Sequence, residues 1–171
     1  MGLNSEEDLV DTKLLTIYLN DHLAGATGAV NRISRMASSY TDLSVHPQLV
    51  HLSVQVREDV DALVALMRQI GVDRRRGTQT VGRAGELAGR LKLNGRLRSR
   101  SPLTPLVEIE ALRSGVLGKL SLWQTLHPHA HALALDATHL VTLQDRARAQ
   151  LQVIQECHGA LSRSAFGEPA G

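Results

Sequence analysis

Hydrophobic residues recur at steps of three and four along four segments of the chain, a spacing that places side chains on one face of an α-helix. The clearest of these stripes runs from Leu49 to Ile70, and another runs from Leu106 to Trp123. We predict helices over residues 5–37, 47–70, 102–126 and 128–163. Because each helix has a hydrophobic side, the four must pack against one another to bury it.

Residues with strong positional preferences set the predicted helix ends. Ser5, which three acidic residues follow, is typical of an N-cap. Pro47 suits the first turn of the second helix, and Gly71 suits a left-handed C-cap. Pro102 and Pro128 suit the starts of the last two helices, because proline is tolerated only in the first turn.

Between residues 72 and 101 the pattern loosens and glycines interrupt it, so we predict a crossover that carries a short helix. Residues 164–171 are expected to form a frayed tail. The whole chain, 1–171, is then a single all-α domain, a four-helix bundle. Two antiparallel hairpins would be joined by the crossover.

Composition supports a helical class and limits the compartment. Of the 171 residues 43% are hydrophobic but only 2% are aromatic, whereas sandwiches and barrels usually need aromatic strands. The single Cys157 excludes an intramolecular disulfide and fits a reducing compartment. The acidic N-terminus is unlike a signal peptide, and no hydrophobic run is long enough to span a membrane. We therefore expect a cytoplasmic protein with no membrane partner.

Three phrases of the sequence resemble a group of bacterial proteins of unknown function. They are YLNDHLAGATGAVNRISRMA at Tyr18–Ala37, RLKLNGRLRSRSPL at Arg90–Leu103 and LVEIEALRSGVLGKLSLW at Leu106–Trp123. Members of that group are all-helical and are similar to the ferritin-like bundle. The resemblance implies the fold and implies no catalytic residue.

A ferritin-like fold raises the question of a metal site. Such sites take a Glu from each of two helices and a Glu-x-x-His pair from each of the others, since residues three apart share a helix face. The candidate ligands here are Asp21, His22, Glu58, Asp136 and His139, which would suit iron or manganese. The alternative is that Asp136 and His139 hydrogen-bond their neighbours while Glu58 faces water. Asp21 and His22 are expected to be a buried polar pair, because the residues one turn away are mostly hydrophobic.

Basic residues gather in the predicted crossover and form a candidate anion site. Its residues are Arg90, Lys92, Arg96, Arg98 and Arg100. They would suit phosphate, anionic lipid or nucleic acid. A nucleic-acid partner is not favoured, because no aromatic residues are interleaved and the net charge of the chain is only +2. The alternative is that these side chains pair with acidic residues of the neighbouring helices, Glu86, Glu108 and Glu110.

Other local patterns imitate catalytic or metal sites. Adjacent helical residues diverge by about 100°, so Cys157 and His158 cannot act as a nucleophile and base, and Cys157 is expected in the core. His127 and His131 are four residues apart, but Pro128 places His127 outside the helix, so exposed histidines are expected. Residues 115–119, with the spacing GxxGK, lie inside a predicted helix and are not a phosphate loop.

These observations favour a non-enzymatic interaction or binding module with no cofactor. The alternatives are a degenerate ferritin-like protein that binds iron or manganese, and anion binding through the crossover. Long hydrophobic stripes also favour a homodimer, in which the alanine- and glycine-rich side of the first helix is a candidate contact. The sequence names no other protein partner.

Overall fold

The computed structural model describes residues 10–74 and 101–167 and contains four long α-helices within them. They are α1 (Thr12–Ser39), α2 (His46–Ile70), α4 (Leu103–Leu126) and α5 (Ala137–Phe166), with a short 3-10 turn, η2, at His127–His129. No strand occurs in these two ranges. The prediction of an all-α bundle of four helices is confirmed.

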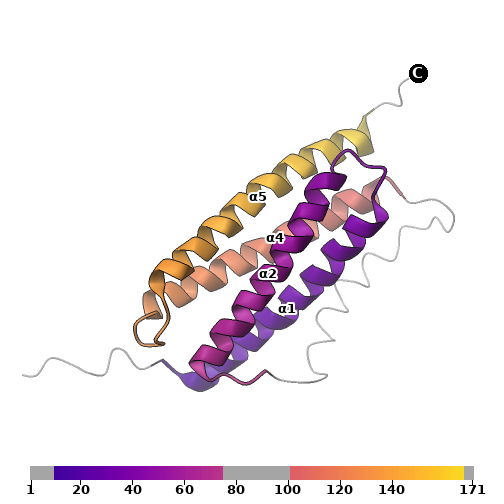
Figure 1. Ribbon diagram of the computed structural model, residues 1–171. Coiled ribbons are helices and arrows are strands. Elements are labelled where there is room, and N and C mark those ends of the chain that lie inside the picture. Colours follow the sequence, from indigo (N-terminus) through magenta and orange to yellow (C-terminus); the bar gives the residue numbers. More distant parts are fainter. Residues whose placement is uncertain (1–9, 75–100, 168–171) are drawn as a thin grey trace, which may run out of the picture.

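The helices pack as two hairpins placed side by side (Figure 1). α1 and α2 turn at one end of the bundle, and α4 and α5 turn at the opposite end. α1 also packs on α4, and α2 packs on α5. The α1–α4 pair is antiparallel, since Tyr18 contacts Thr125 whereas Arg35 contacts Glu108. α2 therefore ends at the opposite end of the bundle from the start of α4, as two hairpins joined by a crossover require.

Aspartates, rather than the predicted residues, begin the first and last helices. Asp11 caps α1 by accepting from the backbone N–H groups of Lys13 and Leu14 at 2.8 and 3.1 Å. Val10 and Asp11 are not helical, so α1 does not run continuously from 5, and Ser5 itself lies outside the described residues. Asp136 caps α5 by accepting from the N–H of Thr138 at 2.8 Å.

The last helix therefore begins at Ala137 and not at 128. Pro128 starts only the 3-10 turn, after which the chain reverses through Ala134, whose φ is 53°. The helix then continues to Phe166, so residues 164–166 belong to α5 and not to a frayed tail. The predicted left-handed C-cap of α2 is confirmed, since Gly71 has a φ of 79° and donates to the carbonyl groups of Arg68 and Met67.

Two clusters of buried hydrophobic residues fill the bundle, one toward each end. The first joins the N-terminal half of α1 to the C-terminal parts of α2 and α4, where Leu19, Met67 and Trp123 are fully buried. The second joins the other halves of these helices with α5, where Ile33 and Leu49 are fully buried. Burying such side chains is the main favourable contribution to folding.

The middle of the bundle belongs to neither cluster. Residues 24–32 of α1, 57–62 of α2 and 117–121 of α4 contribute no buried hydrophobic residue to either. This level of the bundle holds small residues and buried polar side chains instead, and it is where the candidate site lies.

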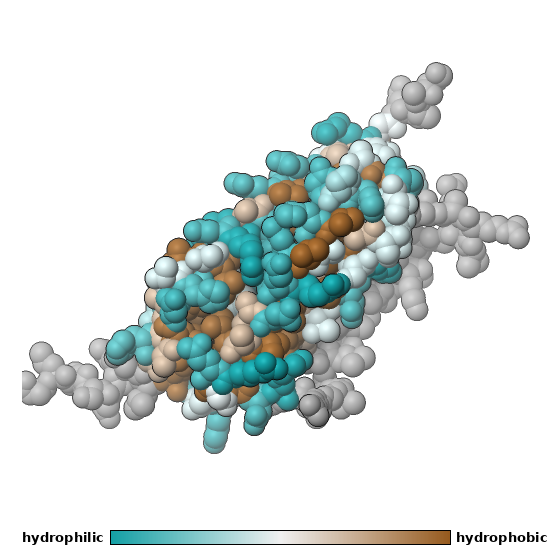
Figure 2. Space-filling view, viewed as in Figure 1, coloured by the Kyte–Doolittle hydropathy of each residue, from teal (hydrophilic) through white to brown (hydrophobic). Residues whose placement is uncertain are grey.

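The surface is mostly polar. Figure 2 shows that hydrophilic side chains cover most of one face, with hydrophobic side chains in small patches between them. Large hydrophobic side chains that stay exposed include Leu14 and Ile17 on α1 and Val50 and Val54 on α2. Among the described residues, no helix combines the length and the hydrophobicity that crossing a membrane would require.

Candidate functional site: a cavity at the middle of the bundle

A buried carboxylate, that of Asp59, organises the middle of the bundle. Asp59 is only 3% exposed and occupies a position in the hydrophobic stripe of α2, between Val56 and Leu63. Its Oδ2 accepts from the Lys119 ammonium and, at 2.9 Å, from the Gln150 amide. A buried charge is stable only when it is paired in this way.

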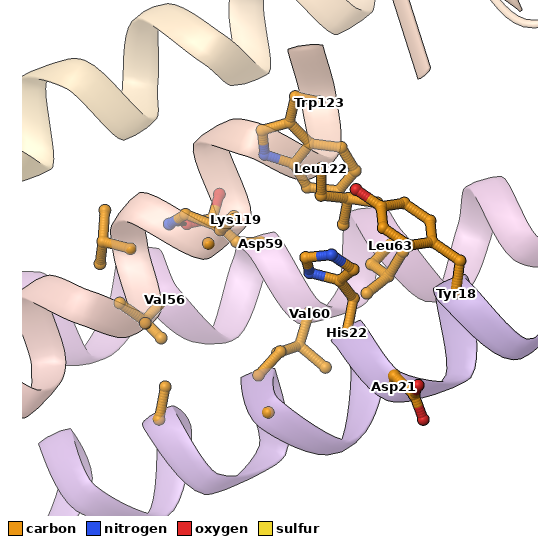
Figure 3. A pocket seen from close by; sticks show the side chains of 16 residues that line it. Tyr18, Asp21, His22, Val56, Asp59, Val60, Leu63, Lys119, Leu122 and Trp123 are labelled. Carbon is orange, nitrogen blue, oxygen red and sulfur yellow. Dashed lines mark hydrogen bonds and ion pairs between the residues drawn. The ribbon is translucent and has the colours of Figure 1, made fainter. Parts of the chain in front are cut away.

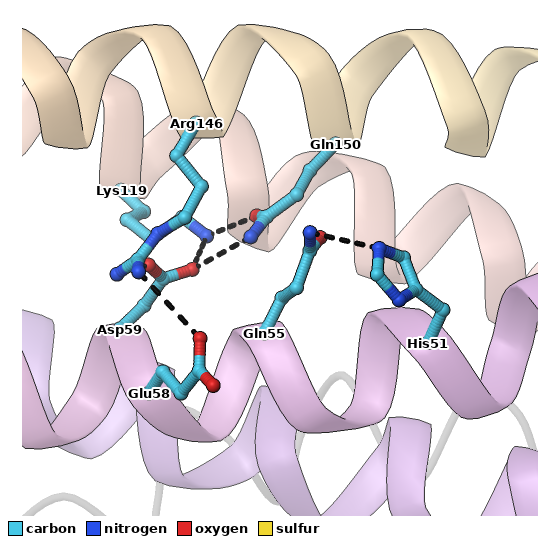
Figure 4. A network of polar contacts seen from close by, with 7 residues as sticks. All are labelled: His51, Gln55, Glu58, Asp59, Lys119, Arg146 and Gln150. Atoms are coloured by element: carbon cyan, nitrogen blue, oxygen red, sulfur yellow. Dashed lines mark hydrogen bonds and ion pairs between the residues drawn. The ribbon is translucent and has the colours of Figure 1, made fainter.

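A second cation, Arg146, also contacts Asp59 in this cluster (Figure 4). The Arg146 guanidinium from α5 forms an ion pair with Asp59 Oδ1, without hydrogen-bond geometry, and lies 3.6 Å from Glu58 Oε2. Glu58 is more than half exposed, so water screens its charge. The cluster therefore combines the buried Asp59 carboxylate and the mostly buried Lys119 ammonium with the side chains of Arg146 and Glu58, which are 29% and 56% exposed.

Lys119 is the cation that faces the α1 side of this cluster. Its ammonium donates to Asp59 and to Gln150 Oε1, and its side chain is only 12% exposed. Burial lowers the pKa of Lys119 below its usual value, and the Coulomb attraction and hydrogen bond of Asp59 oppose that shift. The pairing with Asp59 thus favours the charged ammonium at a depth where burial alone would disfavour it.

A cavity of about 360 Å³ lies beside this cluster, between α1, α2 and α4 (Figure 3). Its wall is mostly hydrophobic and includes Val56, Val60, Leu63 and Leu122. The remaining wall residues are Tyr18, Asp21, His22, Gly25, Ala26, Ala29, Asp59, Gly115, Val116, Gly118, Lys119 and Trp123. Gly25 and Gly115 are exposed, so the cavity reaches the surface between α1 and α4.

Small residues of α1 and α4 bring these two helices together at the cavity. A Cβ atom added to Gly115 would meet the Cβ of Ala29 at 3.6 Å, which is van der Waals contact. The cluster of glycine and alanine in the first helix was expected to allow close approach of a partner. Within the chain, that partner is α4.

Among the described residues that line the cavity, two buried polar atoms accept or donate no hydrogen bond: Asp59 Oδ1, which is ion-paired with Arg146, and the indole nitrogen of Trp123, which has no ion pair either. Trp123 is fully buried, and its indole Nε1 makes no hydrogen bond with any described residue. Trp123 lies one turn after Lys119 on the same face of α4, and Figure 3 shows its nitrogen on the side of the ring nearer Lys119. An unpaired buried N–H costs about 1–3 kcal/mol relative to a paired one.

His22 forms the α1 side of the cavity. Its ring points into the space between the helices and packs edge-on against the Tyr18 ring, with centroids 4.5 Å apart. Burial lowers the pKa of His22, and the nearby Asp21 carboxylate opposes that shift. The imidazole is therefore neutral at pH 7 and presents one N–H donor and one nitrogen acceptor.

The structure does not bring the five predicted metal ligands together. His22 faces the cavity, but Asp21 is exposed and points away from it, so the two are not a buried pair. Glu58 is exposed beside Arg146. Asp136 caps α5, and His139 is exposed in the first turn of that helix. Within residues 10–74 and 101–167, no group of three or more His, Cys, Asp or Glu side chains is arranged to hold a metal ion.

The other sequence-based candidates fall outside the cavity. The predicted anion-binding residues lie between 75 and 100, outside the described residues. His127, His129 and His131 are exposed, as expected. Cys157 is buried, as predicted, and burial raises the pKa of its thiol to about 11, while the adjacent His158 contacts Glu110 at 3.1 Å.

Sequence reasoning missed the three residues that define the polar end of the cavity: Asp59, Lys119 and Trp123. The signal for Asp59 was present, since it occupies a stripe position three residues after Val56 and four before Leu63. Residues 115–119 were correctly placed inside a helix, but the fact that Gly115, Gly118 and Lys119 line a cavity depends on what α1 and α2 place opposite them.

Comparison of the chain with protein families, with curated proteins and with solved structures finds no match. The function of the candidate site must therefore be inferred from its geometry alone.

Proposed function

We propose that this protein is a non-enzymatic binding module that takes a small, largely hydrophobic molecule into the cavity at the middle of the bundle. Ligand sites in proteins are typically concave, mostly hydrophobic and equipped with a few polar groups that fix orientation. The cavity between α1, α2 and α4 has these features. The homodimer and the ferritin-like likeness stay predictions.

The observation that carries this proposal is the unpartnered Nε1 of Trp123 in the cavity wall. A fully buried donor gains a hydrogen bond when a ligand acceptor enters, and no bond within the protein must first be broken. Binding is favoured over catalysis because Asp59, the buried carboxylate at the site, already accepts two hydrogen bonds and forms an ion pair with Arg146. A carboxylate held in this way is a poor general base.

The chain offers a matched pair of variants for a test. Gly25 lines the cavity and Gly28 does not, while both lie on exposed turns of α1 with open space where a Cβ would be. A leucine at either position is a better helix former than glycine, so both variants should fold. Only Gly25→Leu places a side chain at the cavity.

Titration with 1-octanol, followed by the fluorescence of the single tryptophan, measures the occupancy of the cavity. We expect a saturable change in the unaltered protein and in Gly28→Leu, and a change at least tenfold weaker in Gly25→Leu. If 1-octanol binds all three proteins equally, or leaves the fluorescence of all three unchanged up to its solubility, the proposal is overturned.

A further inference from the structure

We infer that the ligand of the cavity is a monocarboxylate, with its hydrocarbon body against the hydrophobic wall and its carboxylate against Lys119 and Trp123. This inference rests on the proposed function and names the class of molecule that the same site would take. It follows from an imbalance between donors and acceptors at the polar end of the cavity.

The acceptors at this end are already used, whereas donors remain. Both oxygens of Asp59 are engaged, Oδ2 by Lys119 and Gln150 and Oδ1 by Arg146. The Lys119 ammonium has three N–H groups and donates two of them to described residues. Trp123 adds an N–H with no partner. A ligand group that only accepts hydrogen bonds therefore fits better than one that donates.

The charges favour an anion over a cation. Lys119, whose side chain is 12% exposed, shares the buried carboxylate of Asp59 with Arg146, which is 29% exposed and also lies 3.6 Å from Glu58. The carboxylates of Glu58 and Asp21 are exposed, so water screens their charges. A single negative charge beside Lys119 would give its ammonium a second ionic partner, whereas a phosphate monoester brings a charge closer to −2, which is harder to bury.

The arrangement of the two donors suits the two oxygens of a carboxylate. Lys119 and Trp123 are four residues apart on α4, which places their Cβ atoms about 5–6 Å apart on one helix face. A dry hydrophobic cavity of about 150 Å³ holds a benzene molecule. The present cavity, at about 360 Å³, has room for a hydrocarbon body larger than that.

Three non-fluorescent probes of equal chain length separate the alternatives: octanoate, 1-octanol and octylammonium. Because Trp123 is the only tryptophan, its fluorescence reports on the cavity directly. We expect octanoate to bind at least tenfold more tightly than 1-octanol, and octylammonium to bind more weakly than either. Equal affinities for octanoate and 1-octanol would overturn the carboxylate assignment and leave binding in the cavity intact. No response to any of the three would overturn the proposed function as well.

Variants then locate the carboxylate. Lys119→Gln should reduce the preference for octanoate over 1-octanol at least fivefold, whereas Lys13→Gln removes an exposed charge of α1 that is not part of the cavity wall and should leave that preference unchanged. Trp123→Phe removes the N–H while keeping an aromatic ring, and calorimetry should find octanoate binding about tenfold weaker. If Trp123→Phe binds octanoate as tightly as the unaltered protein, the indole does not hold the carboxylate and the inference fails.

Discussion

Two buried carboxylates, Asp59 at the middle of the bundle and Glu108 toward one end, meet different surroundings. Glu108 is 4% exposed, accepts from the Tyr40 hydroxyl and lies 2.6 Å from the Arg35 guanidinium, which is itself more than half exposed. Asp59 is equally buried, but Lys119 is mostly buried with it, Arg146 is only 29% exposed, and a cavity adjoins the cluster.

The difference shows that a buried carboxylate can complete the packing of the core in one place and adjoin a candidate binding site in another. At Glu108 the arginine keeps its contact with water, so the ion pair closes the end of the core with no buried cation to satisfy. At Asp59 the mostly buried Lys119 depends on this one carboxylate, and the nearby indole N–H of Trp123 has no hydrogen-bond partner among the described residues. A polar layer of this kind still has hydrogen-bond donors that a ligand could use.

The largest expected effect on stability comes from removing the charge of Asp59. Asp59→Asn would leave the mostly buried Lys119 without its counter-charge and Arg146 with only the exposed Glu58, and breaking a buried ion pair costs about 3–5 kcal/mol. Glu108→Gln should cost about 1–2 kcal/mol, because Arg35 can return to water. Chemical denaturation of both variants measures the two costs. Equal costs would contradict the comparison.

A double variant sharpens that result. In the Asp59→Asn background, Lys119→Met removes the mostly buried cation that has lost its counter-charge. The double variant should therefore be more stable than Asp59→Asn alone, which is a favourable coupling between neighbouring residues. If the two losses simply add, the cluster does not work as one unit.

A smaller gain is expected from the two α1 glycines at the level of the cavity. Gly25→Ala and Gly28→Ala should each stabilise the protein by up to about 1 kcal/mol, since both positions are helical and a Cβ there meets nothing within 4 Å. Thermal or chemical denaturation tests this. A loss of stability in Gly25→Ala alone would mean that the cavity wall has no room for a Cβ atom at this position.

The smallest expected effect is a dependence of stability on pH from His22. Its pKa is lower in the folded protein than in the unfolded chain, so below pH 6.5 the unfolded chain binds the proton more readily. Stability should therefore be complete above pH 6.5 and fall as the pH decreases below it. His22→Phe should flatten this slope relative to the unaltered protein, as measured by denaturation at several pH values. An unchanged slope would show that another group is responsible.

The sequence predicted the helices well because helical periodicity is a local property. In α2, five residues of the predicted stripe, Leu49, Leu52, Val56, Leu63 and Met67, are buried. The helix starts were harder to place. At the start of α5, Pro128 suggested a beginning, but the chain first makes a turn and Asp136 provides the cap.

The candidate site could not be predicted from local sequence patterns, and the reason is physical. Asp136 and His139 have the spacing of a metal-binding pair, yet the same spacing arises when an aspartate caps a helix whose first turn carries an exposed histidine. Glu58 and Asp59 are adjacent, and the stripe position of Asp59 indicates that it is the buried one, but the partners of its carboxylate come from α4 and α5. Which side chains line a cavity depends on residues about 60 to 90 positions away in the sequence.

The indole N–H resonance of Trp123 offers the most direct test of the central claim, that this group is the free polar contact of a ligand cavity. With one tryptophan in the chain, a nitrogen–proton correlation spectrum contains a single indole peak. We expect the peak to shift saturably when octanoate is added to the unaltered protein and to Gly28→Leu, and to shift much less in Gly25→Leu. An indole peak that keeps its position in all three proteins at saturating octanoate would contradict it.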